Sequence, residues 1–309
     1  MGMTMSQKIL AAHAGLDEVL AGQLIEANID LVHGNDITAP LAIREMKKLR
    51  KKTVFDRDKV VLVMDHFVPN KDIVSAKCTQ ICRNFAAEQE LSHYFDVGNM
   101  GIEHALIPEQ GLITAGELSV GADSHTCTYG GIGAFSTGVG STDAGVGMAT
   151  GRAWFKVPET ILFDIEGELP EGACAKDIIL FVIGQIGVDG ALYCAMEFAG
   201  STISGLSIEG RLTIANMAIE AGGKAGLFEV DDKCRAYVER HAEHPLREYH
   251  SDADASYGRV MHIDAADIVP MVSWPHLPSN THPVTESRHI AIDQSVIGSC
   301  TNGRIEDMR

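Results

Sequence analysis

Long hydrophobic runs and aromatic residues are both scarce in this sequence. No apolar stretch approaches the roughly 18 residues that a membrane-spanning helix needs, and the first residues lack the apolar core of a secretory signal. Aromatic residues make up only 6% of the 309 residues, whereas 31 residues are glycine, so tight turns are expected. We therefore expect a cytoplasmic protein with no membrane partner.

Cysteine is present, but without the patterns that give it a structural role. The seven cysteines are odd in number and irregularly spaced, and no two of them form a C-x-x-C pair. This distribution does not fit a disulfide framework and agrees with a reducing compartment.

Basic residues are outnumbered by acidic ones. The chain has 25 lysine and arginine residues against 42 aspartate and glutamate residues, a net charge of −17. Nucleic acids repel such a surface, so none is expected as a partner. The glycine-rich tract 130–151 contains neither the G-x-G-x-x-G nor the G-x-x-x-x-G-K-[ST] pattern. A small anionic substrate remains compatible, because the charge of a pocket is a local property.

The order of apolar patterns indicates an α/β fold. A β-branched run over 60–64 predicts a strand buried on both faces, and the pattern over 72–91 predicts a helix. A chain of 309 residues exceeds the usual size of one hydrophobic core, so several domains are expected. We place a first domain at 1–157, a second at 158–285 and the start of a third at 286–309.

Three further elements are predicted at 141–154 (helix), 210–221 (helix) and 295–297 (strand). The second helix would carry Asn216 and Glu220 on one face, because residues four apart lie on the same side of a helix. The strand would present Cys300 at the amino terminus of a short helix. Backbone N–H groups at such a place lower the pKa of a thiol and favour the thiolate.

Acidic and imidazole side chains occur together at four places where a strand or a glycine turn ends. These places are Asp65-His66, Glu103-His104, Asp123-Ser124-His125, and the pair Asn216 and Glu220. Side chains at the carboxyl ends of adjacent parallel strands converge on one crevice. A carboxylate beside an imidazole fixes its tautomer and raises its pKa, which gives a proton donor near neutral pH. Taken singly, each group also fits a helix cap or a partly buried polar residue. Together with Cys300, they favour proton transfer coupled to a metal.

Taken in order, these motifs resemble a known family. They are Gly34–Pro40, Asp65-His66, Gly101–His104, Gly121–Thr126, Ile214–Glu220 and Gly298–Asn302. The set resembles the aconitase superfamily, and within it the branch of 3-isopropylmalate dehydratase large subunits and their homoaconitase relatives. The resemblance extends over essentially all 309 residues.

The resemblance implies a fold, a cofactor and a reaction. The fold would consist of three-layer α/β/α domains with mixed sheets, the third domain being incomplete here. The cofactor would be a [4Fe–4S] cluster held by three cysteines, the first of them Cys300, with one iron open as a Lewis acid. The enzyme would be a hydro-lyase that reversibly dehydrates a 2-hydroxy di- or tricarboxylic acid.

The resemblance also implies residue roles. His66, with Asp65 behind it, would protonate the departing hydroxyl. The residues that orient substrate and iron-bound water would be His104, Asp123, His125 and Glu220. Substrate contacts would come from Asn35, Asp36, Thr38, Ser124, Asn216 and Asn302.

Some family features are missing from the sequence. The C-x-x-C pair that completes the cluster and the substrate-binding arginines are not found after Cys300. The serine base and the substrate-selective loop belong, by resemblance, to a separate small subunit. We therefore expect a truncated large subunit that alone holds no intact cluster and is inactive. An iron-dependent charge-transfer absorbance together with turnover by these residues would contradict that expectation.

Rival interpretations remain open at this stage. One is a mononuclear metal hydrolase with Asp65, His66, Asp123 and His125 as ligands. Others are a regulatory RNA-binding protein, or an inactive fragment that only docks a partner subunit. Within the dehydratase reading, isopropylmalate in leucine biosynthesis is the favoured substrate, and homocitrate, homoisocitrate and 2,3-dimethylmalate are the alternatives.

Overall fold

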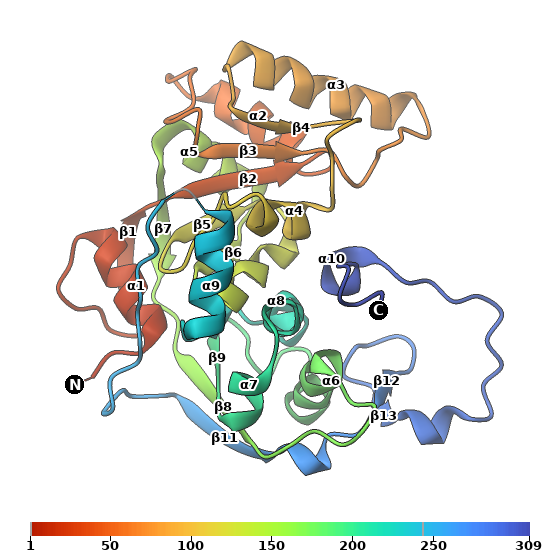
Figure 1. Cartoon of the computed structure of the whole chain (residues 1–309). Helices are drawn as coiled ribbons and strands as arrows, with labels where there is room; N and C mark the ends of the chain where they lie inside the picture. Colours follow the sequence, from red (N-terminus) through yellow and green to blue (C-terminus); the bar gives the residue numbers. More distant parts are fainter. Residues whose placement is uncertain (1, 243) are drawn as a thin grey trace.

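A parallel sheet of five strands organises the first half of the chain. The computed structural model describes residues 2–242 and 244–309, and its strand order here is β4-β3-β2-β5-β6 (Figure 1). The strands are β2 (Leu31–Asn35), β3 (Val60–Val63), β4 (His93–Phe95), β5 (Leu118–Gly121) and β6 (Phe135–Gly138). All of the pairs are parallel, so the carboxyl ends of the strands share one edge.

Both faces of this sheet are covered, as the run over 60–64 predicts. Val60 and Leu62 belong to one hydrophobic core, whereas Val61 and Val63 belong to another, because successive side chains of a strand point to opposite faces. The helices α1 (Met5–Ala14), α2 (Ala39–Lys48), α3 (Ile73–Glu88) and α5 (Ser141–Thr150) cover the first face. The second face packs on α4 (Glu103–Glu109), the 3-10 helix Ser124–Ile132, α8 (Ile208–Asn216) and α9 (Asp232–His241).

A second parallel sheet, of order β10-β9-β8-β11, follows in the chain. Its strands are β8 (Thr160–Glu166), β9 (Ala195–Ala199), β10 (Ala225–Phe228) and β11 (Arg259–Asp264). Helices α6 (Ala175–Ile186) and α7 (Ser201–Gly205) pack beside it. Phe198 stacks between Phe163 and Phe228 with ring centroids 5.2 Å apart on each side.

The two sheets are joined closely. An added Cβ at Gly130, in the 3-10 helix that follows β5, would lie 1.8 Å from the backbone oxygen of Gly226 in β10. Only glycine permits this approach, so the polar turn after β5 is clamped against the second sheet.

The α/β class is confirmed, and antiparallel pairing appears in two short ribbons of the described chain. One joins β1 (Leu24–Asn28) to β7 (Arg152–Lys156), and the other joins β12 (Met271–Ser273) to β13 (Thr281–Pro283). The helix predicted over 141–154 was too long, because Gly151 caps α5 with a left-handed conformation (φ 68°) and β7 begins at the next residue.

Two other predicted elements also differ. The helix predicted over 210–221 is α8 up to Asn216 and then a 3-10 helix over Met217–Ala221, so Asn216 and Glu220 do not share one α-helical face. The strand predicted over 295–297 is irregular chain, with Val296 and Ile297 82% and 69% exposed. Apolar residues form a strand only where another strand can pair with them, and this segment has no such partner among the described residues.

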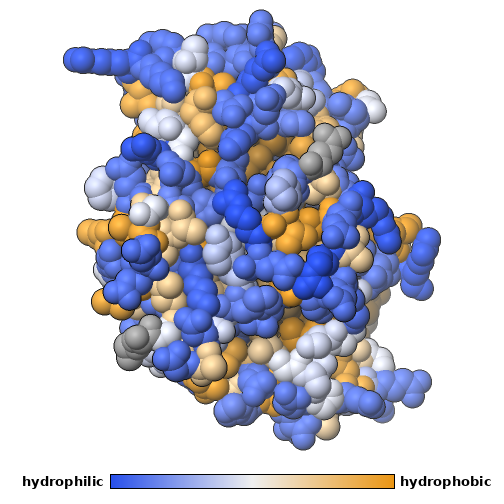
Figure 2. Space-filling model, turned by 60° about the vertical axis from the view of Figure 1, so that its left-hand side comes forward, coloured by the Kyte–Doolittle hydropathy of each residue, from blue (hydrophilic) through white to orange (hydrophobic). Residues whose placement is uncertain are grey.

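The last part of the chain returns to the first sheet. After β13 the chain loops outward and comes back as α10 (Ser299–Asn302), which lies against α8 and α4 (Figure 1). The expectation that residues 286–309 begin a third domain stays a prediction. The face shown in Figure 2 is mostly hydrophilic, with apolar side chains in separate groups.

Within residues 2–242 and 244–309, no helix is both long enough and apolar enough to cross a membrane.

Candidate active site

The predicted polar turns meet at the carboxyl edge of the five-stranded sheet. Asn35 ends β2, Asp65-His66 follow β3, Glu103-His104 begin α4 after β4, and Asp123 follows β5. Hydrogen bonds join these turns directly: the Asn35 Nδ2 atom lies 2.9 Å from Glu103 Oε2 and 3.3 Å from Asp123 Oδ2. The convergence expected from parallel strands is therefore observed.

His66 and Asp65 form the pair that the sequence predicts. The His66 Nδ1 atom lies 2.6 Å from Asp65 Oδ1, and the other Asp65 oxygen accepts the Glu103 backbone N–H at 2.7 Å. The hydrogen bond to Asp65 outweighs partial burial and raises the pKa of His66 to about 9. The His66 side chain is 42% exposed, so a protonated imidazole faces the solvent side of this edge at neutral pH.

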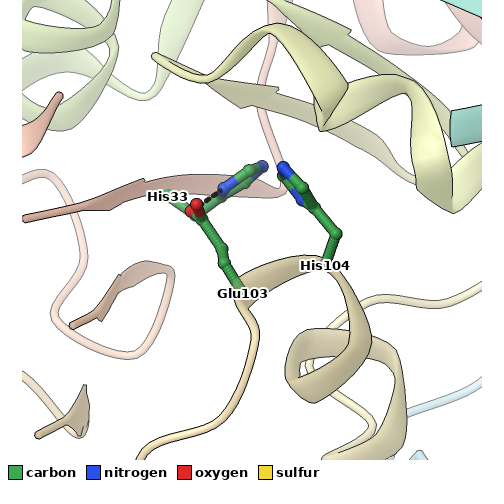
Figure 3. A group of neighbouring side chains, drawn as sticks. All are labelled: His33, Glu103 and His104. Atoms are coloured by element: carbon green, nitrogen blue, oxygen red, sulfur yellow. Dashed lines mark hydrogen bonds and ion pairs between the residues drawn. The ribbon is translucent and has the colours of Figure 1, made fainter. Parts of the chain in front are cut away.

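The next acid and imidazole pairs are not the ones that the sequence predicts. Glu103 binds His33, with Glu103 Oε1 2.6 Å from His33 Nδ1, and not its chain neighbour His104 (Figure 3). His104 instead places Nε2 2.8 Å from Asp123 Oδ1 and Nδ1 2.9 Å from the Tyr129 hydroxyl. Side chains of adjacent residues at the start of a helix point in different directions, so Glu103 and His104 bind different partners.

Charge stabilisation inside this network lowers the pKa of two buried carboxyl groups. Burial alone would raise the pKa of Glu103, but the charge and the hydrogen bond of His33 hold it below its usual range. Burial also opposes ionisation of Asp123, and the bond and charge of His104 outweigh it, so its pKa is likewise lowered. Both groups are therefore carboxylates at neutral pH.

His125 pairs with a side chain from the second half of the chain. Its Nε2 atom lies 3.2 Å from Glu220 Oε1, and this bond lowers the pKa of Glu220. Its Nδ1 atom lies 3.1 Å from the hydroxyl of the exposed Ser124. Its backbone N–H donates to Asp123 Oδ1 at 2.8 Å, which links this pair to the first sheet.

Asn216 connects the same region to Cys300. The buried Asn216 amide donates to Thr128 Oγ1 at 2.8 Å and to Cys300 Sγ at 3.2 Å. The predicted lowering of the thiol pKa was wrong, because burial raises the pKa of Cys300 more than the Asn216 bond lowers it. The helix that begins there has only four residues, Ser299–Asn302, and offers little dipole to oppose burial.

The remaining predicted site residues hold the turns in place. Asp36 is fully buried and accepts the backbone N–H groups of His66 and Phe67 at 3.1 and 2.8 Å, so it fixes the turn that carries His66. Thr38 donates its hydroxyl to Asn35 Oδ1 at 3.0 Å. Asn302 donates to Asp307 Oδ1 at 3.0 Å and to Thr213 Oγ1 in α8 at 3.4 Å. Their predicted contacts with substrate stay predictions.

Sequence reasoning missed His33 and Tyr129 as members of the site. Each is fully buried, and each lies within 6 Å of the His104 ring between ring centroids, at 5.7 and 5.6 Å respectively. His33 lies in β2, two residues before Asn35, and this closeness to the polar motif is the one signal that could have marked it.

The two carboxylates of the mononuclear-hydrolase interpretation already accept hydrogen bonds. The two oxygens of Asp65 accept from His66 and from the Glu103 N–H. The two oxygens of Asp123 pair with His104 and with Asn35. A metal bound by these acids would use the second lone pair of an oxygen that also belongs to this network.

Comparison with known proteins assigns the chain to a family. The profile of a family described as "Aconitase family (aconitate hydratase)" matches residues 7–309. The chain belongs to the aconitase family. It is similar over all 309 residues to proteins named "3-isopropylmalate dehydratase large subunit" from Lachnoclostridium phytofermentans (60% identical), Heliobacterium modesticaldum (59%) and Moorella thermoacetica (61%). The chain covers 73%, 74% and 73% of these relatives.

Membership of the aconitase family implies a [4Fe–4S] cluster in the full-length enzyme, and this chain offers one suitable thiol. The Cys300 thiol accepts a hydrogen bond from the Asn216 amide at 3.2 Å. Cys127 is also close to Asn216 and donates to its backbone oxygen at 3.3 Å, but burial raises the pKa of Cys127 to about 12. Iron–sulfur clusters are held by several thiolates. The described residues place the Cys300 thiol beside Asn216, and its role as a cluster ligand stays a prediction.

Substituting Asp65 by asparagine is expected to lower the pKa of His66 from about 9 toward its ordinary value of 6.5. A nitrogen-15 NMR titration of the imidazole measures this change, and Asp164→Asn, beside the exposed His262, is the control. Because the folded pKa is raised, the stabilisation from the pair is complete below about pH 6.5 and is lost as the pH rises through about 9. If His66 still titrates near 9 in Asp65→Asn, the assigned cause is wrong.

Proposed function

We propose that this chain is the large subunit of a cytoplasmic 3-isopropylmalate dehydratase, a hydro-lyase of leucine biosynthesis. It would dehydrate 2-isopropylmalate or 3-isopropylmalate and rehydrate the alkene on the neighbouring carbon. The observation that carries this proposal is the 56–61% identity, over all 309 residues, with large subunits of that name.

The proposed chemistry begins with a proton held on His66. Loss of a hydroxyl group is unfavourable unless a proton converts it to water. The pKa of His66, raised to about 9 mainly by its bond to Asp65, keeps the donor loaded at neutral pH. Asp65 is 9% exposed and holds the imidazole by Nδ1, so Nε2 is the nitrogen that would deliver the proton. When bound, a [4Fe–4S] cluster with an open iron would supply Lewis-acid chemistry.

The other charged pairs would orient the acid and the water. The pair of His104 with Asp123 and the pair of His125 with Glu220 are fixed in place by hydrogen bonds, so little rearrangement of these groups would be needed during turnover. Asn35, at the end of β2, and Asn216, at the end of α8, bring neutral donors. We propose that Asn216 positions the Cys300 thiolate as cluster ligand and that Ser124, Asp36, Thr38 and Asn302 line or support the substrate site.

A small subunit is the proposed partner. The relatives are named large subunits, which implies a second, smaller chain. We propose that this partner carries the base that removes the proton from carbon and the loop that selects the substrate, because none of the described pairs offers a serine base beside His66.

The test is anaerobic assembly of a full-length large subunit that carries this sequence with a small subunit, iron and sulfide, followed by assay of a panel of acids by proton NMR. Conversion of 2-isopropylmalate into 3-isopropylmalate through the alkene is the expected result. Conversion of homocitrate or 2,3-dimethylmalate instead would keep the hydro-lyase class and change the substrate. An assembled, cluster-loaded complex that converts none of these acids would refute the proposal.

A further inference from the structure

His33 is an ionisable side chain in the middle of the hydrophobic sheet, and the chemistry described so far does not use it. It lies in β2, the central strand, and its side chain is 0% exposed. Figure 3 shows its imidazole facing Glu103, whose side chain is only 1% exposed, with His104 beside them. Buried polar groups are costly, so a pair at this depth calls for a reason.

The imidazole is held in one orientation although this leaves one nitrogen without a partner. His33 Nε2 has no hydrogen bond among the described residues. It lies against Gly121, directly across the β2–β5 pairing, where an added Cβ would be 2.4 Å from His33 Cε1 and 2.7 Å from Nε2. The space thus suits this ring in this position, and the single polar contact that it makes is the bond from Nδ1 to Glu103.

The hydrogen bonds of Glu103 connect His33 to both the His104–Asp123 pair and the His66–Asp65 pair. Its Oε2 atom accepts the Asn35 amide at 2.9 Å, and the same amide reaches Asp123, the partner of His104. Its backbone N–H donates to Asp65, the partner of His66. Moving the Glu103 side chain would therefore remove the shorter of the two hydrogen bonds that orient the Asn35 NH2 group, and a shift of its backbone would disturb Asp65.

We propose that His33 is a positioning residue of this active site, which clamps Glu103 through Nδ1 and thereby sets the Asn35 amide and the two acid–imidazole pairs. The inference rests on the proposed function for its kinetic consequence, but the clamp itself is a property of the fold. His33 lies behind Glu103 and Asn35, so it acts through them and does not touch the substrate.

Two amide substitutions separate this role from simple filling of the core. In His33→Asn, the side-chain NH2 group can take the place of Nδ1 and still donate to Glu103, although volume is lost. In His33→Gln, more of the volume is kept, but the amide reaches the place of Nε2, toward Gly121, and the Nδ1 donor is lost. A clamp predicts that the smaller asparagine preserves function better, whereas a packing role predicts the opposite order.

The test compares wild type, His33→Asn and His33→Gln in the cluster-loaded complex of the full-length large subunit with the small subunit. We expect His33→Asn to keep kcat within about threefold and His33→Gln to lose about 10- to 100-fold in kcat, with a smaller change in KM, because the acids are misplaced. The side-chain amide signals of selectively labelled Asn35 should move in His33→Gln and stay near their wild-type positions in His33→Asn.

The two readouts keep this inference separate from the proposed function. Equal activity of the two variants, or losses that follow only their melting temperatures, would overturn the positioning role. If wild type converts no isopropylmalate, the proposed function fails, and the Asn35 signals still decide whether the clamp exists. Asn35 signals that are unchanged in His33→Gln would overturn the clamp.

Discussion

Replacing His66 by glutamine is expected to lower kcat for isopropylmalate dehydration about 10²- to 10⁴-fold, the usual contribution of a positioned general acid. Glutamine keeps a polar side chain of similar reach but cannot carry the proton that the departing hydroxyl needs. The fold should tolerate the change, because the His66 side chain is 42% exposed and its one bond goes to Asp65. Steady-state kinetics of the assembled complex, with circular dichroism of the same samples, measures both effects.

A matched control is available in the second sheet. His262 also pairs with an aspartate, Asp164, at 2.9 Å, and is 77% exposed, but it lies in β11, away from the converging turns. His262→Gln should therefore leave kcat within about twofold of wild type. If both histidine variants lose activity equally, or if neither does, His66 is not the proton donor.

The largest expected effect on stability comes from Phe198. Phe198→Ala should lower the free energy of unfolding by about 3–5 kcal/mol, the range for truncating a buried aromatic side chain. Its ring is 1% exposed and is stacked on both sides, by Phe163 and by Phe228, so the neighbours cannot close the cavity without giving up their own packing. Chemical denaturation followed by circular dichroism measures the loss.

Trp154→Ala is the control for this stability prediction. Trp154 is the larger side chain, but it is 72% exposed on the β1–β7 ribbon, so its removal should change the free energy of unfolding by less than about 0.5 kcal/mol. Equal losses in the two variants would show that the stack does not anchor the second sheet.

The apolar patterns of the sequence predicted the regular elements well where an element packs on a hydrophobic core. The β-branched run over 60–64 is β3, and the amphipathic segment over 72–91 contains α3. The same logic failed over 295–297, because apolar composition signals a strand only when a pairing edge is present, and that is a tertiary fact. The helix predicted over 141–154 was also too long. Gly151 adopts a left-handed conformation that ends the helix, and the residues after it pair with β1, which is distant in the sequence.

The site was predictable as a set of residues but not as a set of pairs. Parallel strands dictated that Asp65, Glu103 and Asp123 would converge, and they do. Of the neighbouring pairs, Asp65 with His66 holds, because both lie in one short turn. In the other pairs, the imidazole binds an acid that lies 19 to 95 residues away in the chain. Sequence spacing contains no information on such contacts.

The thiol illustrates a competition that sequence cannot decide. A helix start lowers the pKa of a cysteine and burial raises it, and the balance depends on the helix length and on the surrounding packing. Here the helix over Ser299–Asn302 is too short for its dipole to outweigh burial, and the pKa of Cys300 is raised.

The pH dependence of kcat/KM for 3-isopropylmalate in wild type and Asp65→Asn tests the central claim most directly. That claim is that Asp65 holds His66 protonated where the strands converge. The alkaline decline of kcat/KM with pH reports the pKa of the essential acid in the free enzyme. Activity should persist at neutral pH and decline as the pH rises through about 9 in wild type, and the decline should move toward pH 6.5 in Asp65→Asn. An alkaline decline at the same pH in both proteins would contradict the account.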